Sequence, residues 1–129
     1  MTKIIILIKK KPGMSREDFI NHYETSHSVM GKKLLGHLWS KYVRNYPRGV
    51  VEYQPEAISM DGAYDAITEI WLKDEDALAE MTRLINVPEN NRIILEDEEK
   101  FQDRLQTRLF IVDEVENGTA LQPPASFTE

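Results

Sequence analysis

The chain has 129 residues and a net charge of −6, and it contains no cysteine. This length suits a single domain, and the absence of cysteine excludes disulfides, thiolate nucleophiles and thiolate metal sites together. The acidity argues against a nucleic-acid partner, because binding to phosphates needs a concentrated basic surface. The first 48 residues nevertheless carry ten Lys and Arg against three Asp and Glu. This charge either pairs within the fold or forms a basic entrance for an anionic small molecule.

The first predicted element is a strand over residues 3–10. It contains five consecutive apolar residues, Ile4 to Ile8, and it ends before Pro12 and Gly13. Because the run is apolar on both faces, we expect both faces to be buried. The run is too short to span a bilayer, and no small-residue cleavage site follows it, so we expect a cytoplasmic protein without a membrane partner.

A helix is predicted to follow. Ser15 is a suitable N-cap residue, and Glu17 and Asp18 lie in the first turn, where carboxylates favour the positive end of the helix dipole. The pattern predicts a helix that reaches Thr25 or beyond, with one or two further turns before Gly36.

Two histidines lie on this helix. At about 100° per residue, His27 falls within the apolar stripe that contains Phe19 and Tyr23, whereas His22 falls on its flank. An imidazole in a partly apolar site is suited to proton transfer near neutral pH, although a core histidine bonded to a backbone carbonyl is the alternative. His22 and His27 are separated by about 140° on an α-helix, so we do not expect a metal site.

The remaining elements are predicted from composition and from Pro and Gly positions. They are strands at 38–46, 65–72 and 105–115, with helical segments over 74–101 that break near Pro88. The segment 50–64 is long for a connector in a compact domain, and we interpret it as a lid or an irregular hairpin.

This element order predicts an α+β fold of the ferredoxin-like type, β-α-β-β-α-β, with a four-stranded antiparallel sheet and both helices on one face. The domain is expected to occupy residues 1–115, and the tail 116–129 is either disordered or an arm over a neighbouring subunit. The uncovered sheet face is apolar. We therefore predict a homodimer whose two sheets face each other around an enclosed space.

Strand 38–46 contributes candidate cavity residues. Strict alternation places Tyr42 and Tyr46 on one face and Trp39 on the other. The two tyrosines either line a cavity and bind a substrate oxygen, or are ordinary half-buried strand residues.

Strand 65–72 contributes a carboxylate. Glu69 and Trp71 share one face of this strand. If that face is buried, Glu69 is a partner of the histidine or a general base; if it is a rim, Glu69 pairs with a lysine.

Several short motifs, in this order and spacing, resemble the EthD domain family. They are Lys9-Lys10-Lys11-Pro12-Gly13-Met14-Ser15, Glu17-Asp18-Phe19, His22-Tyr23-Glu24 with His27, Tyr42-Val43-Arg44-Asn45, Tyr64 to Trp71, Glu98 to Asp103, and Phe110 to Glu114. The resemblance extends over residues 3–115.

The resemblance implies membership of the dimeric α+β barrel superfamily. Its members share a fold more than a reaction, and they include polyketide cyclases, fungal anthrone decarboxylases, muconolactone isomerases and a protein needed for ether degradation by a cytochrome system. The histidine that the family carries near the end of its first helix corresponds to His27.

From the residues and the resemblance together, we expect a cofactor-independent lyase or isomerase, of decarboxylase, dehydratase or cyclase type, that acts on a cyclic, phenolic or lactone-like metabolite. His27 would transfer a proton, Tyr42 or Tyr46 would bind the developing enolate or phenolate, and Glu69 or Asp65 would orient the imidazole. The expected catalytic residues are His27, Tyr42 and Glu69, and the expected substrate-binding residues are His22, Tyr46, Asp65 and Trp71.

Two other functions remain open at this level. One is a noncatalytic accessory or ligand-binding protein that partners a monooxygenase system. The other, which we favour less, is haem binding by His27. The expected proton chemistry itself needs no metal, nicotinamide or flavin, and the chain has no glycine-rich nucleotide loop.

Overall fold

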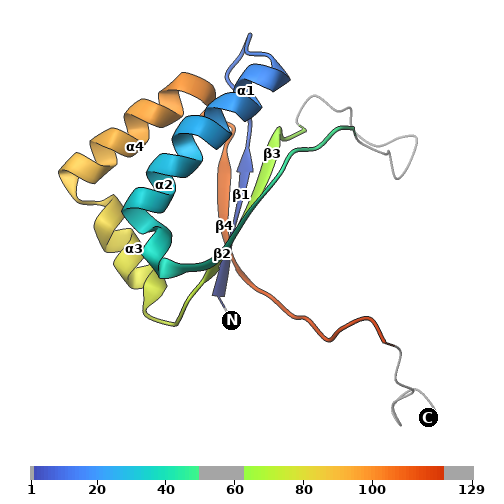
Figure 1. Ribbon diagram of the computed structural model, residues 1–129, viewed down its shortest axis with the longest axis vertical. Coiled ribbons are helices and arrows are strands. Elements are labelled where there is room, and N and C mark those ends of the chain that lie inside the picture. Colours follow the sequence, from blue (N-terminus) through green and yellow to red (C-terminus); the bar gives the residue numbers. More distant parts are fainter. Residues whose placement is uncertain (1, 50–62, 121–129) are drawn as a thin grey trace.

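The computed structural model describes residues 2–49 and 63–120 (Figure 1). The elements are β1 Thr2–Ile8, α1 Arg16–His22, a π-helix Tyr23–His27, α2 Ser28–Leu35, a short 3-10 helix Gly36–Leu38, β2 Trp39–Asn45, β3 Ala66–Leu72, α3 Ala77–Ile85, α4 Pro88–Phe101 and β4 Arg108–Asp113. This order confirms the predicted β-α-β-β-α-β pattern. The first helical connection contains α1, the π-helix, α2 and the 3-10 helix, and the second contains α3 and α4.

The four strands form one sheet in the order β2-β3-β1-β4, and every neighbouring pair is antiparallel. All the helices cover the same face, and the opposite face is open (Figure 1). The fold is therefore the α+β, ferredoxin-like arrangement that the sequence predicts. We call the two faces of the sheet the helix face and the open face.

The alternation of side chains in the central strands explains why they form a sheet covered on one side. In β3 the residues alternate strictly between buried and partly buried, starting from a buried Ala66. In β1, Ile4 and Ile8 are each only 1% exposed, and they lie on the helix face. Helices pack on these buried rows, which gives the protein its core.

Two helix signals that the sequence predicts are found in the structure. Ser15 Oγ accepts a hydrogen bond from Asp18 N at 3.0 Å, which confirms the predicted cap. Pro88 occupies the first turn of α4, after α3 has ended at Ile85. Proline needs no N–H partner there, so the predicted break near Pro88 is also confirmed.

Two predicted regions extend beyond what the structure describes. Most of the segment 50–64 lies outside the described residues, as does 121–129 of the C-terminal tail. The last strand is shorter than the predicted 105–115, because Leu105 lies in the preceding turn and is 86% exposed. Within the described ranges, no helix is both long enough and apolar enough to cross a membrane.

Candidate functional site

The π-helix between α1 and α2 brings the two histidines of this region together. Ser28 N donates to the carbonyl of Tyr23, five residues earlier, in place of the usual four. This wider turn places residues five apart on the same side, whereas an α-helix would separate them by about 140°. The α-helical projection places His22 on a flank of the helix. In the structure, His22 lies on the same side of the helix as His27. It shares a partner with His27.

That partner is Asp97 of α4, which accepts three side-chain hydrogen bonds. His27 Nδ1 lies 2.8 Å from Oδ2, while His22 Nε2 and Ser26 Oγ lie 3.1 and 2.6 Å from Oδ1. Burial alone would raise the pKa of the Asp97 carboxyl, but the hydrogen bonds from His27 and Ser26 outweigh it and lower the pKa to about 2. Near neutral pH the carboxylate is ionised and can only accept. His27 therefore carries its proton on Nδ1, and its Nε2 lone pair is free for chemistry when the ring is neutral.

Phe101 fixes the position of both rings. It lies one turn after Asp97 on the same face of α4, and it is fully buried. Its ring centroid is 4.8 Å from those of both His22 and His27. The imidazoles are thus held between a carboxylate and an aromatic wall.

Sequence reasoning missed Asp97. It is one of four consecutive acidic residues, Glu96 to Glu99, and such a run is usually a solvated helix face. The available signal was its spacing: Asp97 lies four residues before a large aromatic residue, at a position where the helical period predicts an inward-facing side chain.

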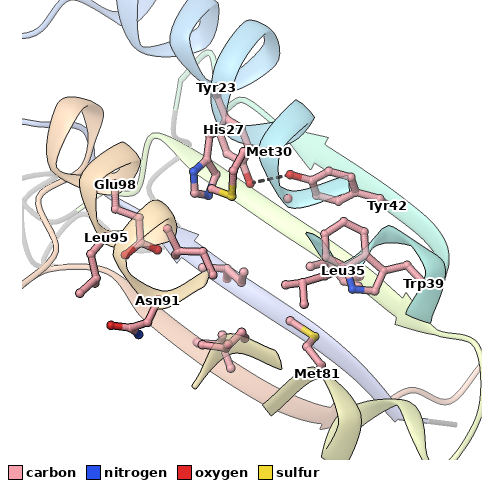
Figure 2. A pocket seen from close by; sticks show the side chains of 16 residues that line it. Tyr23, His27, Met30, Leu35, Trp39, Tyr42, Met81, Asn91, Leu95 and Glu98 are labelled. Carbon is pink, nitrogen blue, oxygen red and sulfur yellow. Dashed lines mark hydrogen bonds between the residues drawn. The ribbon is translucent and has the colours of Figure 1, made fainter. Parts of the chain in front are cut away.

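A pocket of about 260 Å³ lies beside His27, between the helices and the sheet (Figure 2). His27, Glu98 and Asn91 lie toward one end of it, and Trp39 and Met81 toward the other. The complete lining is Ile6, Tyr23, His27, Met30, Gly31, Leu35, Trp39, Tyr42, Ile70, Met81, Ile85, Asn91, Ile94, Leu95, Glu98 and Leu109. This pocket lies within one chain on the helix face, whereas the sequence analysis placed the enclosed space between two sheets.

Two tyrosines that line the pocket are linked by hydrogen bonds between their hydroxyl groups. Tyr23 Oη lies 2.5 Å from Thr68 Oγ1, and Tyr42 Oη donates to Tyr23 Oη at 3.4 Å (Figure 2). Burial raises the pKa of Tyr23 and that of Tyr42, so both phenols stay protonated. They are therefore hydrogen-bond donors near neutral pH, and not bases.

Tyr46 does not line the pocket. Its hydroxyl hydrogen-bonds to Glu24, which also receives two hydrogen bonds from Arg44, at 3.0 and 2.6 Å. The hydrogen bonds from Arg44 are the main cause of the lowered pKa of Glu24, which burial opposes. This cluster ties β2 to the π-helix and thereby holds the segment that carries His27.

Glu69 is not the partner of His27. Thr68 and its alternate neighbours in β3 face the helices, so Glu69 lies on the open face. It accepts hydrogen bonds from Lys3 Nζ at 2.8 Å and from Asn45 Nδ2 at 3.0 Å, and these lower its pKa in spite of burial. The sequence left two interpretations of Glu69 open, a partner of the histidine or a residue paired with a lysine. The structure has Glu69 paired with a lysine.

Trp71 and Asp65 also lie away from the pocket. Trp71 is on the open face, where its Nε1 donates to Glu114 at 2.6 Å. Asp65 precedes β3, and its carboxylate accepts from the backbone N–H of Lys10 at 2.8 Å. The latter contact anchors the end of a strand and does not orient an imidazole.

Glu98 is a second ionisable group on the pocket wall that sequence reasoning missed. Burial raises its pKa, although His27 and Arg104 act in the opposite direction, and its Oε1 lies 3.3 Å from Arg104 Nε. Asn91, Ile94, Leu95 and Glu98 follow the i, i+3, i+4, i+7 spacing of one helix face, which was the available signal.

The matched family model is described as the EthD domain, and it covers residues 11–105. This range runs from before α1 to beyond α4, so it contains both histidines and Asp97. The chain belongs to the EthD domain family. No curated protein matches it.

Solved structures agree with this assignment at the level of the fold. An ethyl tert-butyl ether D (EthD) family protein of Bacillus halodurans is 22% identical, with a TM-score of 0.58, covering 89% of this chain and 99% of its own. HapK of Hahella chejuensis is 10% identical, with a TM-score of 0.57 and coverages of 95% and 100%. A dimeric ferredoxin-like protein of unknown function from Thermobifida fusca is 13% identical, with a TM-score of 0.55 and coverages of 86% and 88%.

In this EthD domain, the imidazole of His27, the phenols of Tyr23 and Tyr42 and the carboxyl group of Glu98 line a mostly apolar pocket. Such a set can take a proton from a bound molecule, stabilise the resulting oxyanion and return the proton elsewhere. The described residues contain no group of three or more His, Asp or Glu side chains placed to hold a metal ion.

Proposed function

We propose that this protein is a cofactor-independent lyase or isomerase that uses His27 to move a proton on a cyclic, phenolic or lactone-like metabolite in the pocket. The observation that carries the proposal is the hydrogen bond of 2.8 Å between His27 Nδ1 and Asp97 on one side of a ring that lines an apolar pocket on the other. The carboxylate holds the imidazole in one tautomer and stabilises the imidazolium that forms during the reaction.

The proposed step begins when His27 Nε2 takes a proton from an acidic C–H or O–H of the ligand. The electron pair remains on the ligand as an enolate or phenolate, whose oxygen accepts the hydrogen bond that Tyr42 otherwise donates to Tyr23. The imidazolium then returns the proton to another atom, which completes an isomerisation or assists the loss of a leaving group. In this scheme Asp97 replaces Glu69 and Asp65 as the orienting carboxylate.

Glu98 supplies a second acid or base in the same scheme. Its raised pKa leaves a larger protonated fraction near neutral pH than an exposed glutamate has. It lines the pocket together with His27. It can thus donate a proton to one atom of the ligand while His27 removes one from another.

The test starts from native mass spectrometry of small molecules that the purified protein retains, followed by incubation with the compound found. In His27→Gln, we expect turnover to fall by about 10²- to 10⁴-fold, the usual contribution of a general base, while ligand binding persists. His37→Gln is the matched control, because His37 lies in the 3-10 helix and does not line the pocket.

Unchanged turnover in His27→Gln, with the fold intact, would overturn the catalytic assignment. Binding without turnover by the wild-type protein would instead favour the noncatalytic, ligand-binding role, in which the protein partners a monooxygenase system.

We also propose that the protein acts as a homodimer that buries the open face. Supporting this, the open face carries apolar side chains from all four strands, and a neighbour of the same fold is described as dimeric. Phe110, at the centre of β4, is 47% exposed in the single chain.

A further inference from the structure

Trp39 lies at the end of the pocket away from His27, and a bulge places it there. The pairing of β2 with β3 shifts register between Trp39 and Lys41. Alternation is interrupted at that point, so Trp39 faces the helices beside Tyr42, with ring centroids 4.8 Å apart. The indole packs closely against α2, since a Cβ at Gly31 would lie at van der Waals distance, 3.4 Å, from Trp39 Cη2. The strict alternation used in the sequence analysis predicted the opposite face.

The indole N–H of Trp39 is a buried donor without an acceptor. Its Nε1 is shielded from solvent, and no described residue accepts a hydrogen bond from it. Figure 2 shows this nitrogen on the side of the ring toward Leu35 and Met81. Trp71 differs from Trp39 in this respect, because its Nε1 donates a hydrogen bond to Glu114 at 2.6 Å. A buried donor left unpaired costs about 1–3 kcal/mol, and such groups are rare enough to need an explanation.

We propose that the side chains covering Trp39 Nε1 shift when a ligand binds, and that this nitrogen then donates a hydrogen bond to a neutral acceptor oxygen of the ligand, the carbonyl of a ketone, quinone or lactone, and so selects ring compounds that carry one. This proposal rests on the proposed function, because it assumes that the pocket holds a ring-containing ligand. The acceptor is neutral because Leu35, Met81 and Ile85 make this end of the pocket apolar. A ligand carboxylate at this end would lose its hydrating water without a positively charged side chain to pair with, so its binding would be unfavourable.

The two ends of the pocket then select two features of one ligand. The end with His27 and Glu98 suits a phenol or an enolisable C–H, which can exchange a proton. The end with Trp39 suits an oxygen that only accepts. The inferred ligand is therefore a flat, mostly apolar ring system with a proton-exchanging group at one end and a carbonyl at the other.

Two probes of similar shape test this. Umbelliferone is a hydroxycoumarin, with a phenol at one end and a lactone carbonyl at the other; β-naphthol has the phenol and the fused rings but no carbonyl. Calorimetric titration is done at a pH at which both phenols are neutral. In Trp39→Phe we expect umbelliferone affinity to fall about three- to tenfold, the effect of one hydrogen bond, and β-naphthol affinity to change less than about twofold.

Heteronuclear NMR of the wild-type protein provides a readout that does not depend on the folding of the variant. The chain has two tryptophans, and the indole N–H signal missing from Trp39→Phe identifies that of Trp39. Umbelliferone should move this signal downfield and β-naphthol should not. The signal of Trp71, on the other face of the sheet, is the internal reference.

Equal loss of affinity for both probes in Trp39→Phe, or no downfield shift with bound umbelliferone, would overturn the role of Trp39. In either case the wild-type protein still binds ring compounds, and the proposed function stands. If neither probe binds the wild-type protein, the inferred ligand class is wrong, and the role of Trp39 falls with it.

Discussion

Asp97 determines which nitrogen of His27 faces the pocket. The histidine itself was predictable, because its position on the apolar stripe follows from helical periodicity. Its partner was not, because Asp97 lies 70 residues further along the chain, among acidic neighbours of the same type. Its spacing of four residues from Phe101 indicates that Asp97 faces inward, but it does not indicate which side chain Asp97 meets there. Only the packing of α4 against the π-helix selects it.

The low pKa of Asp97 predicts a pH-dependent contribution to stability. A carboxyl whose folded-state pKa of about 2 lies below the usual 3.8 stabilises the fold above the usual value, and this stabilisation is lost as the pH falls through both. We expect Asp97→Asn to be less stable by about 1–2 kcal/mol at about pH 6, after allowing for solvent screening. The difference should shrink toward about pH 2–3. Urea unfolding at several pH values measures it, and a difference independent of pH would contradict the assignment.

At the level of elements, the π-helix and the bulge in β2 both depart from regular periodicity, and both affect the pocket. The π-helix brings His22 and His27 to one carboxylate, and the bulge brings Trp39 to the helix face. Each amounts to one residue in excess of the regular repeat. Periodic reasoning from sequence assumes a constant angle per residue, so it misplaced His22 and Trp39.

Deletion of Thr25 tests whether the π-helix is an inserted residue. Thr25 is exposed and lies within the π-helix. Its removal should leave a continuous α-helix, in which His22 and His27 become four residues apart and remain on the same side. We expect the free energy of unfolding to change by less than about 1 kcal/mol, a typical effect at an exposed site.

Deletion of the exposed Lys33 in α2 is the control. There the helix has no extra residue, so the deletion rotates Leu35 out of the core and should cost about 2–5 kcal/mol. Chemical denaturation and circular dichroism compare the two variants. Equal losses of stability would show that the π-helix is not a removable insertion.

At the level of the whole molecule, the sheet has one covered face and one open face. The open face combines apolar side chains with a charged cluster in which Lys3 Nζ lies 2.8 Å from Glu69 and 2.7 Å from Glu114. Lys3 is only 6% exposed even in the single chain. Burial alone would lower the pKa of Lys3, but the hydrogen bonds that Lys3 donates to the two carboxylates raise it, so the charges of this cluster would stay paired in the proposed dimer.

Replacement of Phe110 by glutamate tests the proposed dimer. Phe110 pairs with Ile5 of β1 on the open face, so the new carboxylate would be buried without a partner in the dimer. We expect Phe110→Glu to be a folded monomer in analytical ultracentrifugation. Val29→Glu, at a site 37% exposed on α2, should leave the mass unchanged. A dimer that persists in Phe110→Glu would contradict burial of this face.

By itself, the sequence determined the element order, the sheet with one covered face, the helix cap at Ser15, the break near Pro88 and the inward position of His27. These features depend on interactions between residues close in the chain, and periodicity and capping report such interactions directly. The tertiary structure alone decided that Asp97 is the partner of His27, that Glu69 faces away, and that Trp39 enters the pocket. Those outcomes depend on how helices and strands pack across long separations, and on two one-residue departures from a regular repeat.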